Sequence, residues 1–250
     1  MDDPSHDADA AGTRRFALRR LHSLAGVLPL GVFLGVHLWT NLQAVRGRAA
    51  FDHAVGAIQA TPALSVVEAA FILAPLAFHA IYGVVLAAQS RPTVRRYGYL
   101  GNWLFTLQRV TGAAALAFIV MHLGQFRVPK LTGALRWEGF HDRLASLLGS
   151  PGMFAAYVLG LTACVFHFAN GLWTASQTWG LAATSDARRT VGWLCLAIGV
   201  TLWVFGIDTL LHFFYRCGGI VPLPGLDRDA FCRDGDMLSA ATRGLPTVFS

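Results

Sequence analysis

The sequence predicts an all-α, polytopic membrane protein with five transmembrane helices. Hydrophobic residues make up 54% of the 250 residues and charged residues only 14%, whereas an average soluble domain carries about 25% charged residues. Stretches without any Asp, Glu, Lys or Arg cover residues 21–45, 69–90, 144–185 and 190–207. Because about 20 apolar residues span a bilayer as a helix, these observations exclude a soluble enzyme, a nucleic-acid-binding protein and a disordered chain.

The expected helices follow from these apolar stretches and from the Pro, Gly and polar residues between them. They cover residues 18–44, 63–89, 102–126, 152–178 and 190–215. The segment 128–149 is long enough for a short interfacial helix. The resulting organisation is a solvated N-terminal tail (1–15), a five-helix transmembrane domain (16–217) and an irregular C-terminal tail (218–250).

Basic residues near the helix ends predict the orientation in the membrane. The net charge of +6 reflects arginines at helix ends. On one side they lie before the first helix, between the second and third, and between the fourth and fifth; the other side holds as many basic residues, but acids such as Asp52, Glu68 and Glu138 dilute them. Basic residues gather at cytoplasmic helix ends, so we expect the N-terminus in the cytoplasm.

Four cysteines are too few for a disulfide scaffold. Cys164 and Cys195 lie in apolar stretches, where they act as small hydrophobic residues. Cys217 and Cys232 follow the last helix and could form a disulfide if that side of the membrane is oxidising.

The histidines carry the most specific pattern in the chain. Each of the first four helices holds one, and their flanking residues are paired. The first and third helices read Phe33-x-x-x-His37-Leu38 and Phe118-x-x-x-His122-Leu123, and the second and fourth read Phe78-His79-x-x-x-Gly83 and Phe166-His167-x-x-x-Gly171. This pattern is typical of a helical hairpin that is repeated after 85 to 88 residues.

The depth of each histidine follows from a rise of about 1.5 Å per helical residue. His37 and His122 lie roughly 6–10 Å from the outer ends of their helices, and His79 and His167 lie roughly 21–24 Å from theirs. Two pairs at two depths match two bis-histidine haems b in a bundle of the first four helices. Because two imidazoles saturate the iron, such haems transfer electrons. A histidine-lined transport path and packing alone are the alternatives, since membrane histidines also serve proton relays.

Two further polar residues lie near the cytoplasmic side. His22 begins the first helix and could donate to a haem propionate or line a quinone site, or it could be a plain interfacial histidine. Arg109 is a costly charge near the start of the third helix. A haem propionate is the partner that we expect for it, and extension of the side chain to the headgroups is the alternative.

With these residues in place, the sequence resembles a known family. Leu21-His22-Ser23-Leu24-x-Gly26, His37-Leu38-x-x-Asn41 and Gln108-Arg109-Val110-Thr111-Gly112 are similar to motifs of the succinate dehydrogenase/fumarate reductase di-haem cytochrome b membrane anchor, in its single five-helix form. The resemblance covers about residues 16 to 215.

The resemblance implies a membrane anchor for a flavoprotein and an iron–sulfur subunit, as in respiratory complex II of the tricarboxylic acid cycle. Succinate would be oxidised at the flavin, so this chain alone would not act on succinate. Electrons would pass from the iron–sulfur subunit to the His79/His167 haem, then to the His37/His122 haem, and then to a quinone, with menaquinone the one expected. The localisation implied is the bacterial cytoplasmic (inner) membrane, and the reverse reaction, quinol:fumarate reduction, stays open.

Quinone reduction takes up two protons, so a carboxylate or histidine is expected near the distal haem. Candidates are Asp52 and His53, with Trp39 and Asn41 nearby on the first helix. Two other functions compete: the di-haem cytochrome of a hydrogenase, formate dehydrogenase or nitrate reductase, and, from a different class, a histidine-lined membrane transporter. One histidine on each of the first four helices favours the succinate/fumarate family.

Overall fold

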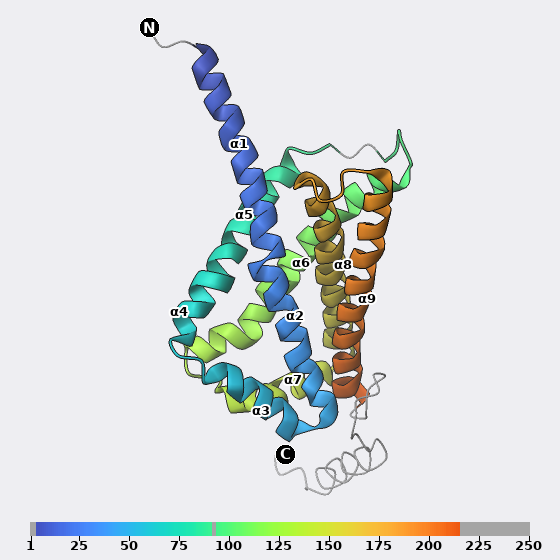
Figure 1. Ribbon diagram of the computed structural model, residues 1–250. Coiled ribbons are helices and arrows are strands. Elements are labelled where there is room, and N and C mark those ends of the chain that lie inside the picture. The colour runs from blue at the N-terminus through green and yellow to red at the C-terminus, as the bar shows by residue number, and fades with distance from the viewer. Residues whose placement is uncertain (1–3, 92–93, 216–250) are drawn as a thin grey trace, which may run out of the picture. The chain divides into compact units, whose positions relative to one another are not determined.

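The computed structural model describes residues 4–91 and 94–215, and every regular element in these ranges is a helix (Figure 1). Five helical spans are long and apolar enough to cross a membrane: Gly12–Arg46, Leu64–Ala88, Leu100–Leu131, Pro151–Thr178 and Ser185–Tyr215. The predicted all-α fold with five transmembrane helices is therefore confirmed. The predicted C-terminal tail, with Cys217 and Cys232, lies outside the described residues.

The first span runs from within α1 (Pro4–Val27) through α2 (Pro29–Leu42) to the end of a short 3₁₀ segment, η1 (Gln43–Arg46). Pro29 has no backbone N–H and interrupts the helical ladder. Helical backbone hydrogen bonds continue on both sides of Pro29: the Leu28 amide donates to the Leu24 carbonyl at 2.9 Å, and the Val32 amide donates to the Leu28 carbonyl at 3.0 Å. α1 begins inside segment 1–15, for which the sequence predicts a solvated tail.

The second span contains α4 (Leu64–Glu68), a π-helical segment, η2 (Ala69–Leu73), and α5 (Ala74–Ala88). Pro75 lies in the first turn of α5. Its ring has no N–H and crowds the carbonyl of the preceding turn, and a wider π turn before it relieves that conflict.

The other three spans are the single helices α6 (Leu100–Leu131), α8 (Pro151–Thr178) and α9 (Ser185–Tyr215). The sequence predicts that this helix ends at residue 126, before Pro129, whereas α6 ends five residues later, at Leu131. The helix includes Pro129 in its last turn, where only one ladder bond is lost. Beyond the helix, the Leu135 amide donates to the Pro129 carbonyl at 3.1 Å.

Two shorter amphipathic helices lie between the spans. α3 (Arg48–Gln59) follows Gly47, whose φ of 108° favours glycine, and buries Phe51 and Val55. α7 (Phe140–Leu148) follows the 3₁₀ segment η3 (Trp137–Gly139) and buries Leu144 and Leu148. α7 confirms the helix expected in 128–149, whereas α3 lies where only a connection was expected.

The chain forms two compact units. Among the described residues, unit 1 contains 4–36, 62–91, 94–120 and 162–202, and unit 2 contains 37–61, 121–161 and 203–215. In unit 1, α1 packs against α5; in unit 2, α3 packs against α7 and η3.

Large apolar side chains on the long helices are exposed. Val32, Ile81 and Leu159 are 63%, 69% and 72% exposed. A soluble protein rarely presents such surface to water, whereas lipid tails solvate it. The exposure therefore fits helices that face lipid.

Candidate functional site

The first histidine pair lies in unit 1. The rings of His79, on α5, and His167, on α8, have centroids 6.1 Å apart and are nearly perpendicular, at 87°. The sequence predicts that these two histidines lie at the same depth in the membrane, and in the structure their rings face each other from two different helices.

Backbone carbonyls hold both rings of this pair. His79 Nδ1 lies 3.0 Å from the His22 carbonyl oxygen, and His167 Nδ1 lies 2.9 Å from the Gln108 carbonyl oxygen. A carbonyl only accepts hydrogen bonds, so each Nδ1 carries the proton and donates. In the neutral ring, Nε2 then keeps its lone pair for a ligand-binding role.

Glycines opposite the two rings provide the space for them. A Cβ on Gly26 would lie 2.5 Å from His79 Cε1, and a Cβ on Gly112 would lie 2.8 Å from His167 Cε1. Both distances are shorter than real Cβ contacts allow. Only glycine therefore fits at these positions without displacing an imidazole.

The glycines one turn after the histidines have different neighbours. A Cβ on Gly83 would lie 3.1 Å from His22 Nε2, and a Cβ on Gly171 would lie 3.2 Å from Gln108 Nε2. The α1–α5 and α6–α8 pairs thus use the same contacts, with Gln108 taking the place of His22. This correspondence supports the hairpin repeat that the flanking residues of the histidines indicate.

Polar side chains support the α6–α8 pairing as well. Gln108 Nε2 donates to the His167 carbonyl at 3.0 Å, and Asn170 Nδ2 donates to Gln108 Oε1 at 2.7 Å. These bonds fix the register of α8 on α6 and so the position of His167.

His22 stacks on the first pair. Its ring lies 4.1 Å from the His79 ring, at an interplanar angle of 7°. His22 Nε2 is buried and finds no hydrogen-bond partner among the residues that the structure describes. Its proposed role at a propionate or a quinone stays a prediction.

Arg109 is half-buried on α6. Its Nε donates to Ser90 Oγ at 2.5 Å, its Nη1 donates to the Phe105 carbonyl at 2.6 Å, and its guanidinium lies 3.2 Å from the Phe105 ring centroid. The groups that this cation contacts are therefore neutral, and its pairing with a propionate stays a prediction.

The second histidine pair lies in unit 2. The rings of His37, on α2, and His122, on α6, have centroids 5.7 Å apart at 84°. Asn41 Nδ2 donates to the His37 carbonyl at 2.7 Å and lies 3.4 Å from His37 Nε2. Asn41, a predicted quinone-site residue, is thus directly beside one of the paired histidines.

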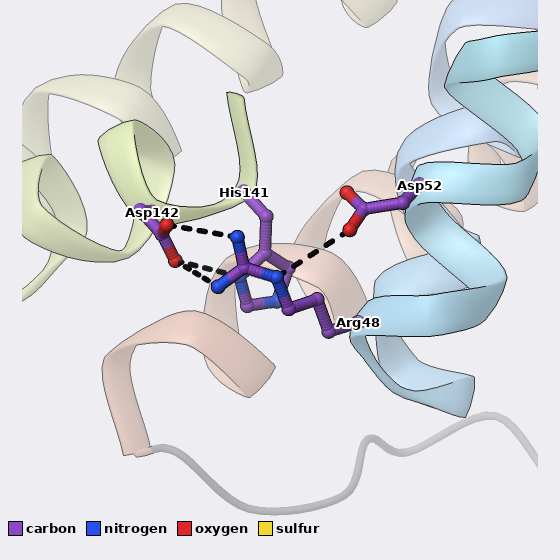
Figure 2. A network of polar contacts seen from close by, with 4 residues as sticks. All are labelled: Arg48, Asp52, His141 and Asp142. Atoms are coloured by element: carbon purple, nitrogen blue, oxygen red, sulfur yellow. Dashed lines mark hydrogen bonds and ion pairs between the residues drawn. The ribbon is translucent and has the colours of Figure 1, made fainter. Parts of the chain in front are cut away.

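The remaining quinone-site candidates, Trp39, His53 and Asp52, have different surroundings in the structure. Trp39 is 52% exposed and contacts Phe205 on α9 at 5.8 Å between ring centroids. His53 is exposed on α3. Asp52 belongs to a network, shown in Figure 2, in which Arg48 lies between the carboxylates of Asp52 and Asp142.

This network joins α3 to α7. Arg48 binds both Asp142 oxygens, at 2.5 and 2.9 Å, and Asp52 Oδ2 at 3.4 Å. Because the Arg48 and Asp142 side chains are 51% and 62% exposed, the pair contributes only about 0–1 kcal/mol. The Arg48 guanidinium holds the pKa of Asp142 below its usual value, so this contribution is lost only at strongly acidic pH.

His141, also in the network, makes the packing of α7 sensitive to pH. It lies against the rings of Phe51 and Phe213, at centroid distances of 5.6 and 5.0 Å. Burial lowers the pKa of His141 below 6.5, the Arg48 guanidinium lowers it further, and Asp142 and Asp52 act in the opposite direction. The unfolded segment therefore binds more protons than the folded one, and stability falls as the pH drops below about 6.5.

We expect backbone amides of α7 to exchange faster at pH 5.5 than at pH 7, after correction for intrinsic exchange rates. The His141→Phe variant keeps the aromatic packing and should lose most of this difference. Hydrogen-exchange mass spectrometry of both proteins provides the measurement. An equal pH effect in both would show that another group is responsible.

The sequence did not identify Tyr157, which contacts the site, or Asp208, a buried acid on the last helix. Tyr157, 4% exposed on α8, lies with its hydroxyl 3.2 Å from His122 Nδ1. Asp208 is fully buried on α9, although acids inside membrane helices are costly and commonly functional. A lone acid near the end of the last apolar helix is a signal that could have identified Asp208, whereas no sequence signal points to Tyr157.

The fold and the site define an α-helical membrane protein with two half-buried pairs of imidazoles. The family described as succinate dehydrogenase/fumarate reductase transmembrane subunit matches residues 87–206. The succinate dehydrogenase cytochrome b558 subunit of Bacillus subtilis (strain 168) is 39% identical over 203 residues, which is 81% of this chain and 99% of that protein.

The chain therefore belongs to the succinate dehydrogenase/fumarate reductase family of membrane cytochrome b subunits, as the resemblance predicted. It is an integral membrane protein.

Proposed function

We propose that this chain is the membrane anchor and di-haem electron-transfer subunit of a succinate:quinone oxidoreductase. The observation that carries the proposal is the presence of two facing histidine pairs, His79/His167 and His37/His122. A haem with two imidazole ligands carries one electron at a time and has no open coordination position. The four residues would therefore hold two haems b for electron transfer rather than for oxygen chemistry.

The ring separations fit this role. Two imidazoles that bind one iron from opposite sides, with metal–nitrogen bonds of about 2 Å, have ring centroids roughly 6 Å apart. The observed separations are 6.1 and 5.7 Å. No group of three or more His, Cys, Asp or Glu side chains suited to a metal occurs in the described ranges, and a haem needs only two protein ligands.

The surroundings of the rings fit as well. Ligand histidines usually donate their second ring N–H to a carbonyl or another acceptor, which fixes the tautomer. His79 and His167 do so to carbonyls, and Gly26 and Gly112 leave the rings the room they need. Of the other polar residues, Arg109 and His22 are our candidates for the propionates of the haem at His79 and His167.

The proposed partners are a flavoprotein subunit and an iron–sulfur subunit, both outside this chain. In this proposal the N-terminus faces the cytoplasm of a bacterial inner membrane. His79 and His167 form the pair nearer to that side, where electrons enter. A quinone, menaquinone in our proposal, accepts them beyond His37 and His122. Asp52, His53, Trp39 and Asn41 are the candidates for its site, and fumarate reduction by quinol is the same route in reverse.

The experiment is a haem count on the purified chain. A pyridine haemochrome assay should give two non-covalent haems b per chain, and the spectrum should be low-spin because each iron has two imidazoles. The chain alone should oxidise no succinate, and activity should appear only with the two partner subunits. One haem per chain, or a high-spin spectrum, would contradict the two-pair assignment.

A further inference from the structure

A side chain contacts the Nδ1 atom of His122. This Nδ1 lies 3.2 Å from the Tyr157 hydroxyl oxygen, and the Tyr157 hydroxyl donates to Gln125 Oε1 at 2.6 Å. Gln125 Nε2 in turn donates to Met153 Sδ at 3.4 Å. His122 and Gln125 lie on α6, and Tyr157 and Met153 lie on α8.

The donors and acceptors in this chain of contacts have a definite direction. An amide Oε1 can only accept, so the hydroxyl hydrogen of Tyr157 points to Gln125. The lone pairs of the Tyr157 oxygen are then available to the His122 Nδ1–H. Because successive hydrogen bonds polarise one another, the bond to Gln125 makes the phenol oxygen a better acceptor.

The two histidine pairs differ in the group that accepts the hydrogen bond from the ring Nδ1–H. Backbone carbonyls of His22 and Gln108 accept from the ligands of the first pair, and no side-chain substitution removes a carbonyl. In the second pair, the acceptor at His122 is a buried phenol. A single substitution can therefore remove it.

We infer that Tyr157 is a positioning residue that fixes the tautomer of His122 and sets the reduction potential of the haem held by His37 and His122. The inference rests on the proposed function. A hydrogen bond from Nδ1–H makes the imidazole a more basic ligand, and a more basic ligand favours ferric over ferrous iron. Loss of the bond should therefore raise the potential.

The test is a redox titration of the intact complex carrying Tyr157→Phe. An outer partner of a metal ligand is typically worth 10–100-fold in metal affinity. If ferric binding is weakened about tenfold more than ferrous binding, the midpoint potential of one haem rises by about 59 mV. The other haem should keep its potential, and the haem count should stay at two.

Two more variants make the test decisive. Gln125→Leu keeps the phenol but removes its acceptor, so it should shift the same haem in the same direction by a smaller amount. Tyr82→Phe is the control: it removes a phenol hydroxyl in unit 1, where Tyr82 packs against Phe78. It should leave the midpoint potential of the His37/His122 haem unchanged. If Tyr157→Phe prevents haem loading, the Gln125→Leu titration decides.

An unchanged potential in both Tyr157→Phe and Gln125→Leu would overturn the inference, as would equal shifts of both haems. Failure of the proposed function would appear separately. In that case the wild-type complex itself would show fewer than two haem transitions, before any variant is compared.

Discussion

The His167→Ala variant is expected to lose one of two haems and to lower succinate:quinone reductase activity by at least about 100-fold. Outer partners of metal ligands already contribute up to about 100-fold, and His167 is proposed as a ligand itself. Succinate oxidation with an artificial acceptor should persist, because on the proposed route such an acceptor takes electrons before they reach this chain. Both activities and the haem content of the assembled complex are measured.

Leu159→Ala is the control for this variant. Leu159 lies on the same helix, α8, but is 72% exposed, so truncating it should leave both haems and both activities unchanged. Full quinone reductase activity in His167→Ala would contradict the role of this histidine.

The Gly112→Ala variant should also disturb the His79/His167 pair. The added Cβ would lie 2.8 Å from His167 Cε1, and the ring cannot retreat without losing its bond to the Gln108 carbonyl. Overpacking of this kind costs about 1–3 kcal/mol. We expect less haem per chain and haem loss at lower temperature, followed by the Soret absorbance during heating.

Gly124→Ala is the matched variant on the same helix, because nothing lies within 4 Å of a Cβ at Gly124. Alanine is favoured over glycine in a helix by about 0.8–1 kcal/mol, so this substitution should be neutral or stabilising. Equal behaviour of the two alanine variants would show that the contact between Gly112 and His167 does not matter.

The transmembrane helices and the histidine pairs could be predicted because their signals are local. Apolar length defines a membrane span, and a helical rise of about 1.5 Å per residue converts sequence position into depth. His37 and His122, like His79 and His167, were paired on this basis, and their rings face each other in the structure.

The features that could not be predicted depend on how neighbouring helices meet. The hydroxyl of Tyr157 meets His122 only because α6 and α8 pack in one register, and sequence spacing does not define that register. The same holds for Gly26 and Gly112, whose significance lies in the imidazole opposite each. α3 was missed because its amphipathic pattern is short and directly follows Gly47, whose φ is positive.

The most direct test of the central claim is a redox titration of four single variants: His37→Ala, His79→Ala, His122→Ala and His167→Ala. Each should be followed by its optical and low-spin electron paramagnetic resonance signals. We predict that His79→Ala and His167→Ala lose one haem signal and that His37→Ala and His122→Ala lose the other. Loss of the same signal in His37→Ala and His79→Ala would contradict the pairing.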